Sequence, residues 1–194
     1  FQNILKLIKY YDADIMTGPQ VYKQNEKNTS EIFEKKIYKN NTLVNWAASN
    51  KIIFKKNIIK KENIYFDKKL NKFGVGEDQL FFAILNKLGY KIIWSKKLKV
   101  FEKTHLHRNS LKWVTNRSFR LGVLGMYIDT KLYGFINGYL INYMKFFYYL
   151  FSSILSLLII NHKYYRYEFF NLLARSIGRL LAPIYFKKTN FYKK

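Results

Sequence analysis

The chain has 194 residues, and its 35 lysines and arginines against 12 acidic residues give a formal net charge of +23. This length suits one domain with an appendage, and the absence of cysteine argues against a disulfide framework or a thiolate zinc site. The charge raises the question of an anionic partner such as nucleic acid, phosphate or a membrane surface.

The N-terminal part of the chain predicts alternating helices and short strands. Apolar residues at helical or alternating spacing are separated there by glycine, proline and polar turn residues. The predicted elements are a helix at 1–11, a strand at 14–22 with a bend at Gly18-Pro19, a polar loop at 23–45 with a short helix around 31–38, a strand at 52–54 and a helical segment at 55–63.

Two adjacent carboxylates, Glu77 and Asp78, follow a loop at 65–76 and open a helix predicted over 77–88, with Gly89 as its stop. The helix dipole favours the ionised form of acids in the first turn. An ionised carboxylate on a packed helix is suited to act as a general base. The alternative is that the two acids only cap the helix.

Two further strands and a long helix are predicted next. The strands cover 91–94 and 98–101, the second ending at Glu102, and a loop at 103–109 leads to Ser110 as the N-cap of a helix at 111–128.

The C-terminal region is apolar and basic. Residues 139–160 are mostly apolar but are interrupted by Asn142 and Lys145, so a bilayer span is left open. A second amphipathic helix is predicted at 166–182, with phenylalanine and leucine on one side and arginine on the other. We expect contact with a membrane surface, and two ordinary core helices are the alternative.

An ordered set of motifs runs through the middle of the chain, and it resembles the family 2 glycosyltransferases of GT-A type, above all the bacterial exopolysaccharide and succinoglycan-type glucosyltransferases. The resemblance covers about residues 1–125. Its motifs are Ala48-Ser49-Asn50, Phe66-Asp67, Gly76-Glu77-Asp78, Gly89, Ile93-Trp94, Val100-x-Glu102, Arg108, Trp113, Arg117, Arg120 and Gly122.

This resemblance implies an α/β fold, namely the C-terminal, acceptor-side half of a GT-A domain at 1–128, followed by a helical membrane-associated region at 129–194. It implies an inverting transfer of a sugar from a nucleotide-sugar donor to a lipid-linked or polysaccharide acceptor. The expected place is the cytoplasmic face of a bacterial cell membrane, in the synthesis of cell-surface glycans.

The resemblance also assigns roles to single residues. Asp78 is expected to be the catalytic base and Glu77 its acceptor-side neighbour. Substrate binding is implied for Asn50, Asp67, Arg108, Trp113, Arg117 and Arg120. The guanidinium of Arg108 has the fork geometry to bind the phosphate of the leaving group.

A divalent metal, Mg²⁺ or Mn²⁺, is expected from the resemblance, held by an Asp-x-Asp motif. Asp12-Ala13-Asp14 has this spacing, but residues 13–19 match the later Ala-Asp-Ile-x-x-Gly-Pro strand of the family. We therefore expect the metal motif and the nucleotide-binding strands upstream of Phe1, in which case this chain alone would be inactive.

His105 and His107 lie two residues apart in the loop at 103–109, so an extended chain places them on one side. One of them is a candidate metal ligand or diphosphate contact. The alternative is a pair of solvated loop residues.

Two other functions compete with the transferase. A basic, aromatic chain suits single-stranded nucleic acid, but the aromatic residues cluster in apolar runs and no nucleic-acid-binding motif is present, so no nucleic-acid partner is expected. A non-enzymatic basic membrane protein would leave the Gly76-Glu77-Asp78 motif unexplained.

Overall fold

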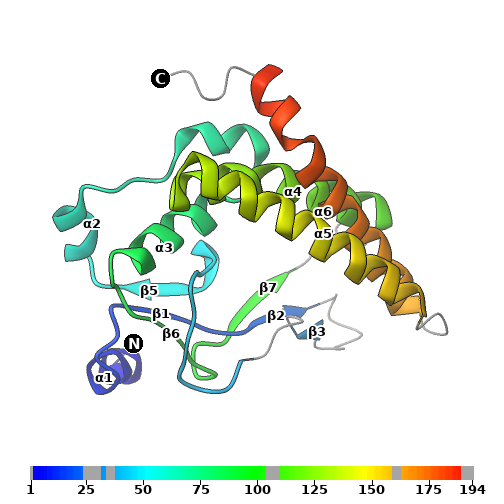
Figure 1. Cartoon of the computed structure of the whole chain (residues 1–194). Coiled ribbons are helices and arrows are strands. Elements are labelled where there is room, and N and C mark those ends of the chain that lie inside the picture. The colour runs from blue at the N-terminus through cyan, green and yellow to red at the C-terminus, as the bar shows by residue number, and fades with distance from the viewer. Residues whose placement is uncertain (1, 24–31, 34–37, 104–109, 159–162, 189–194) are drawn as a thin grey trace. The chain divides into compact units, whose positions relative to one another are not determined.

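The computed structural model describes residues 2–23, 32–33, 38–103, 110–158 and 163–188 (Figure 1). The chain divides into two compact units. The first, which we call the α/β unit, comprises residues 1–67 and 77–106, and the second, the helical unit, comprises 68–76 and 107–194. The predicted α/β class is thus confirmed at the level of a mixed α/β chain.

Short elements build the α/β unit. Its helices are α1 (Gln2–Tyr10), α2 (Asn57–Glu62) and α3 (Glu77–Lys87), with a 3₁₀ turn, η1 (Ser49–Lys51). Its strands are β1 (Ile15–Thr17), β2 (Gln20–Lys23), β3 (Ile32–Phe33), β4 (Thr42–Leu43), β5 (Ile52–Phe54), β6 (Ile92–Trp94) and β7 (Val100–Lys103).

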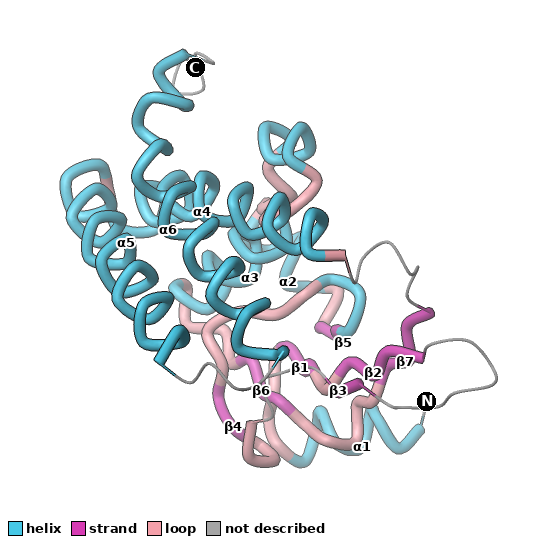
Figure 2. The backbone as a smooth tube through the Cα atoms, turned by 90° about the vertical axis from the view of Figure 1, so that its right-hand side faces the viewer, coloured by secondary structure: helices cyan, strands magenta, loops and turns pink. Residues whose placement is uncertain are grey.

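The strands form two small mixed sheets, drawn in magenta in Figure 2. One has the order β4-β6-β1-β5 and the other β3-β2-β7, with β1 parallel to β6 and β2 parallel to β7. Gly18-Pro19 separates β1 from β2, as the predicted bend requires. A Cβ atom on Gly18 would lie 2.1 Å from the carbonyl oxygen of Leu98, so only glycine fits where the chain crosses there.

A hydrophobic core lies between the larger sheet and α3. Because Phe81, Phe82 and Leu85 recur at helical spacing, they share one face of α3 and pack with Ile15 and Trp94 from the strands. All five are at most 3% exposed, so α3 is held firmly against the sheet and its first turn is fixed in place.

Most elements predicted for this unit are confirmed with shifted ends. The helix at 1–11, the strands at 52–54 and 91–94, and the stop at Gly89 with φ +93° are all present. The short helix predicted around 31–38 is wrong at its start, because residues 32–33 form β3 and pair antiparallel with β2. Backbone pairing to a distant strand has overridden the local preference there.

The helical unit consists of α4 (Leu111–Tyr133), α5 (Phe135–Leu158) and α6 (Lys163–Lys188), preceded by the 3₁₀ segment η2 (Lys68–Phe73). Ser110 caps α4 as predicted, since its hydroxyl accepts a hydrogen bond from the Trp113 amide at 3.2 Å. The three helices lie side by side in both views (Figures 1 and 2). Among the described helices, none combines the length and apolar character that crossing a bilayer requires.

The division by packing differs from the predicted boundary after residue 128. That boundary falls inside α4, which packs on α5 and α6 and belongs with them to the helical unit. Residues 68–76 join the same unit because Phe73 contacts Tyr185 and Phe186 of α6.

Close approach of α4 and α6 depends on glycine. A Cβ atom on Gly122 would lie 2.2 Å from the carbonyl oxygen of Arg175, and one on Gly178 would lie 2.3 Å from that of Phe119. Both obstacles are helix backbone, so neither can rotate away as a side chain could.

Gly122→Ala should therefore destabilise the helical unit. In an open helix this change would stabilise by about 1 kcal/mol, but here overpacking should cost about 1–3 kcal/mol in the free energy of unfolding. Thermal unfolding followed by circular dichroism measures the difference. Asn116→Ala, at an exposed position of α4, is the control and should leave the unfolding midpoint unchanged or raise it. A midpoint for Gly122→Ala at or above that of the wild type would contradict this packing.

A pH dependence follows from the pair Tyr90 and Glu62. The Tyr90 hydroxyl donates to Oε1 of Glu62 at 2.5 Å, and this bond to a carboxylate raises the pKa of Tyr90 from 10.0 to about 12. The folded state thus holds the proton more tightly, so the stabilisation is complete below pH 10 and is lost as pH rises through about 12.

We expect Tyr90→Phe to be less stable than wild type below pH 10 and to approach it as pH rises towards 12. Urea unfolding across this range measures the gap. Tyr65→Phe, at a ring that is 72% exposed, is the matched control. A gap for Tyr90→Phe that stays constant with pH would show that the hydrogen bond does not shift the titration.

Candidate functional site

Three elements of the α/β unit form hydrogen bonds to the 3₁₀ turn η1. The hydroxyl of Thr17, the last residue of β1, donates to the carbonyl oxygen of Lys51 at 3.0 Å in a buried position. Oδ2 of Asp78 accepts from the Ser49 amide at 3.1 Å, and Oε2 of Glu102 accepts from the Asn50 side chain at 3.1 Å. The turn therefore brings two carboxylates to adjacent residues of one segment.

Asp78 lies in the first turn of α3, as predicted. Gly76 adopts φ +92°, which a side chain would strain, and this allows the loop to turn into the helix. The second oxygen of Asp78, Oδ1, accepts from the Gln79 amide at 2.7 Å. Since each carboxylate oxygen can accept more than one hydrogen bond, Asp78 retains acceptor capacity for a substrate hydroxyl.

Glu77 is half-buried beside it. Its Oε2 is buried and has no hydrogen-bond partner among the residues that the structure describes. A buried acceptor without a donor is costly unless water or a ligand satisfies it. Glu77 is therefore suited to receive a donor group, such as a hydroxyl, from a bound molecule.

Glu102 joins this group from β7. It also accepts a hydrogen bond from the side-chain amide of Gln20, which is only 5% exposed on β2. Its bonds to Asn50 and Gln20 tie the second sheet to the turn that Thr17 anchors to the first sheet.

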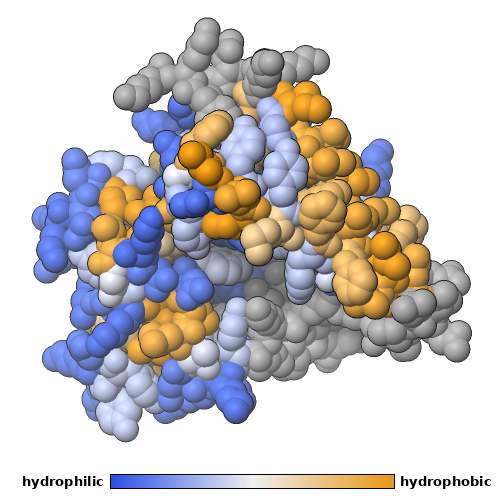
Figure 3. All heavy atoms as spheres, viewed as in Figure 1, coloured by the Kyte–Doolittle hydropathy of each residue, from blue (hydrophilic) through white to orange (hydrophobic). Residues whose placement is uncertain are grey.

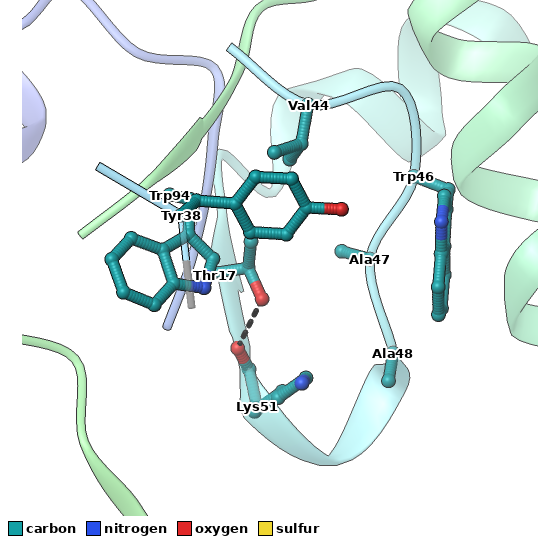
Figure 4. Close-up of a pocket in the computed structure, with 8 residues that line it drawn as sticks. All are labelled: Thr17, Tyr38, Val44, Trp46, Ala47, Ala48, Lys51 and Trp94. Carbon is teal, nitrogen blue, oxygen red and sulfur yellow. Dashed lines mark hydrogen bonds between the residues drawn. The ribbon is translucent and has the colours of Figure 1, made fainter. Parts of the chain in front are cut away.

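A small cavity of about 70 Å³ lies beside the same turn (Figure 4). Its lining comes from Thr17, Tyr38, Val44, Trp46, Ala47, Ala48, Lys51 and Trp94. The mixture of aromatic faces, one hydroxyl and one lysine suits part of a polar organic ligand such as a sugar. Trp94 is buried, whereas Trp46 is 42% exposed, so Trp46 is not an ordinary core residue.

The carboxylates of Asp12 and Asp14 are used in ion pairs. Oδ1 of Asp14 lies 3.1 Å from Nζ of Lys55, its Oδ2 accepts from the Lys91 amide, and Asp12 pairs with Nζ of Lys91 at 3.2 Å. They precede β1, at the end opposite Thr17. Across the described ranges, no cluster of three His, Asp or Glu side chains forms a metal site, so these residues do not fit the expected metal.

Asp67 is half-buried at the end of the first segment of the α/β unit. The preceding Phe66 stacks on Phe81 of α3 with ring centroids 4.5 Å apart. The Phe-Asp motif is therefore attached to the same helix that carries Asp78.

Trp113, Arg117 and Arg120 belong to the helical unit. The Arg117 guanidinium lies 5.2 Å from the centre of the Trp113 ring. Arg120 donates to the carbonyl oxygen of Phe73 at 2.9 Å, which attaches the 68–76 segment to α4 and gives this arginine a structural role.

His105, His107 and Arg108 lie outside the described residues. Their predicted roles as metal ligand and phosphate contact remain predictions.

Sequence reasoning missed Thr17 and Gln20. The available signal was position, because Thr17 ends β1 and Gln20 begins β2 on either side of Gly18-Pro19. Side chains at the carboxyl ends of parallel strands frequently line a site.

Comparison with known proteins does not assign this chain to a family. No protein-family model matches the chain, and no curated protein or solved structure matches it.

Loss of the Asp78 carboxylate should loosen η1. A single net hydrogen bond is worth about 1 kcal/mol, or about fivefold in an opening equilibrium, so Asp78→Ala should speed hydrogen exchange at the Ser49 amide by about that factor. Exchange of the peptide around residues 46–52 measures it. Asp12→Ala, which removes a carboxylate elsewhere in the unit, should leave this peptide unchanged, and equal exchange in both variants would argue against the Ser49–Asp78 bond.

Proposed function

We propose that this chain is the acceptor-side part of an inverting glycosyltransferase of GT-A type. It moves a sugar from a nucleotide-sugar donor to a lipid-linked or polysaccharide acceptor. Its place is the cytoplasmic face of a bacterial membrane, in the synthesis of surface glycans.

The observation that supports this proposal most is the convergence of three motifs on η1. Ala48-Ser49-Asn50, Gly76-Glu77-Asp78 and Val100-x-Glu102 are distant in the sequence, yet Asp78 and Glu102 bond to the neighbouring residues Ser49 and Asn50. Two acids that served only their own helix and strand would have no reason to meet at one turn.

In the proposed reaction Asp78 is the general base. It takes the proton of an acceptor hydroxyl as the oxygen forms a bond to the anomeric carbon of the donor sugar. The bond from that carbon to the phosphate oxygen breaks at the same time, the nucleoside diphosphate leaves with the bonding electrons, and the configuration inverts. Glu77 accepts a hydrogen bond that orients the acceptor.

The cavity beside η1 gives the sugar a place next to the base. Ala48 lines the cavity, and the next residue, Ser49, holds Asp78. Aromatic side chains such as Trp46 and Tyr38 present flat apolar faces to a sugar ring, and the polar groups of Thr17 and Lys51 supply the few oriented contacts that specificity needs.

The divalent metal has no fitting donor set in the described residues, since Asp12 and Asp14 are paired with lysines. No step of the proposed reaction is therefore assigned to it here. The family resemblance places its ligands in a segment upstream of Phe1.

Asp78→Asn should abolish transfer in the full-length gene product. Removing a general base typically costs about 10²–10⁴-fold in rate, and the amide keeps the shape and one acceptor oxygen. The assay measures release of nucleoside diphosphate from a panel of nucleotide sugars, with bacterial membranes as the source of acceptor.

Asp12→Asn is the matched control, because it makes the same chemical change at an exposed carboxylate outside the site. It should transfer as wild type does. Undiminished turnover by a folded Asp78→Asn protein would eliminate Asp78 as the base. A wild-type protein with no turnover of any donor in the panel would favour the non-enzymatic membrane protein.

A further inference from the structure

The polarity of α5 is inverted relative to a helix that packs on a water-soluble core. Its buried residues, within the part of the helix whose side chains are described, are Gly138, Asn142, Ser153 and Ser156. Large apolar side chains face outward instead, among them Leu140, Met144, Phe147, Phe151, Ile154 and Leu155. A soluble amphipathic helix turns its apolar stripe inward. Exposure of the outer face of α5 to water is therefore unfavourable.

The polar groups on the inner side of α5 are satisfied within the helical unit. Asn142 donates to the carbonyl oxygen of Arg179 at 3.1 Å and accepts from its guanidinium at 3.3 Å. The hydroxyls of Ser153 and Ser156 donate to carbonyl oxygens of α5 itself. Internal pairing of this kind is what a helix in contact with hydrocarbon requires, because no water is there to replace it.

The one charged side chain of α5 is paired with a buried carboxylate, although it is itself 41% exposed. Lys145 is its only charged residue, and Nζ lies 2.7 Å from Oδ1 of Asp129 on α4, whose other oxygen binds Arg179 at 2.5 Å. The large exposed side chains of α5 are therefore apolar or tyrosine, and its one charge is paired with Asp129.

This face extends over the length of the helix and continues onto α6. The 24 residues of α5 span about 36 Å, and Ile177, Leu181 and Ile184 of α6 are exposed as well. Figure 3 shows hydrophobic side chains gathered along these helices. Continuous apolar surface of this kind marks an interaction site.

We infer that α5 lies along the surface of an anionic phospholipid membrane with its outer face in the acyl region of one leaflet. Residues 107–194 carry many lysines and arginines but only two acids, Asp129 and Glu168. Each basic residue near anionic lipid contributes about 1 kcal/mol, whereas a second copy of so basic a unit would be repelled. The occupant favoured by charge is therefore lipid.

The orientation follows from the packing. Because α4 and α6 cover one side of α5 along its length, only the opposite side is available to lipid. A helix with an apolar strip along one side suits a position parallel to the membrane plane, with exposed Tyr143 and Tyr148 at headgroup level, where tyrosine is enriched. This inference deepens the membrane location within the proposed function, but its test needs no sugar transfer.

The first experiment is sedimentation of the full chain with vesicles of phosphatidylcholine and phosphatidylglycerol. Met144→Asp with Phe151→Asp should weaken binding at least about tenfold, because each change places a charge against the acyl chains. Leu43→Asp with Tyr65→Asp, at side chains 66% and 72% exposed in the α/β unit, is the matched control. It makes the same change in net charge and should bind as wild type does.

Equal loss in the two double variants would mean that attachment is electrostatic only, and it would overturn the inference. So would binding of the Met144 and Phe151 variant at wild-type strength. If the wild type does not bind vesicles but forms a dimer that the Met144 and Phe151 variant disrupts, the outer face of α5 binds a second copy instead.

A second experiment uses the absence of cysteine. Leu140→Cys, Phe147→Cys and Ile154→Cys, all on the exposed face, are labelled singly with an environment-sensitive fluorophore. Lipids with spin labels at shallow or deep acyl positions then quench it. Equal shallow depth at all three supports the inference, and these single changes do not depend on the folding of an Asp variant.

A depth that runs from one headgroup region through the bilayer centre would show a crossing helix, and no quenching would show no immersion. Either outcome overturns the inference. Failure here with intact sugar transfer leaves the proposed function standing, and immersion without transfer leaves α5 as a membrane-binding helix of a protein with another activity.

Discussion

The placement of the two carboxylates of the candidate site depends on the hydrogen bonds that meet at Ser49–Lys51. The bonds from Thr17, Asp78 and Glu102 close sequence separations of 34, 29 and 52 residues. None of them is local, so the turn takes its shape only when β1, α3 and β7 are already assembled. The two carboxylates are consequently placed by the fold of the unit and not by their own loops, and hydrogen bonds in one such network do not contribute independently.

The helical unit rests on a different constraint, a buried carboxylate. Asp129 is almost fully buried between Arg179 and Lys145. Desolvating such a group costs several kcal/mol, and apolar replacements are often as stable, so its value lies in fixing which residues face one another. Asp129, Lys145 and Arg179 stand on α4, α5 and α6 in turn. One carboxylate thus sets the register of all three helices, while Gly122 and Gly178 set how closely two of them approach.

Local signals in the sequence predicted the local structure well. The helical spacing of Leu80, Phe81 and Leu85, the cap at Ser110 and the bend at Gly18-Pro19 each act through nearest neighbours. The partners of Glu102, the strand at 32–33 and the division of the chain inside α4 depend on contacts between distant residues, which periodicity does not encode. The same holds for the candidate site, where Asp78 was predicted from its position in a helix and Thr17 and Gln20 were not.

The net charge alone does not separate nucleic acid from lipid, because both are anionic. The arrangement of apolar and charged groups does. A surface that binds nucleic acid places basic side chains among its aromatic ones, since the phosphates and bases of each nucleotide are neighbours. The exposed aromatic side chains of α5 are accompanied by a single lysine, and this lysine is paired with the buried Asp129. In a lipid membrane the hydrocarbon and the phosphates form separate layers, with the hydrocarbon beneath the phosphates. An apolar helix face within a basic chain matches that separation.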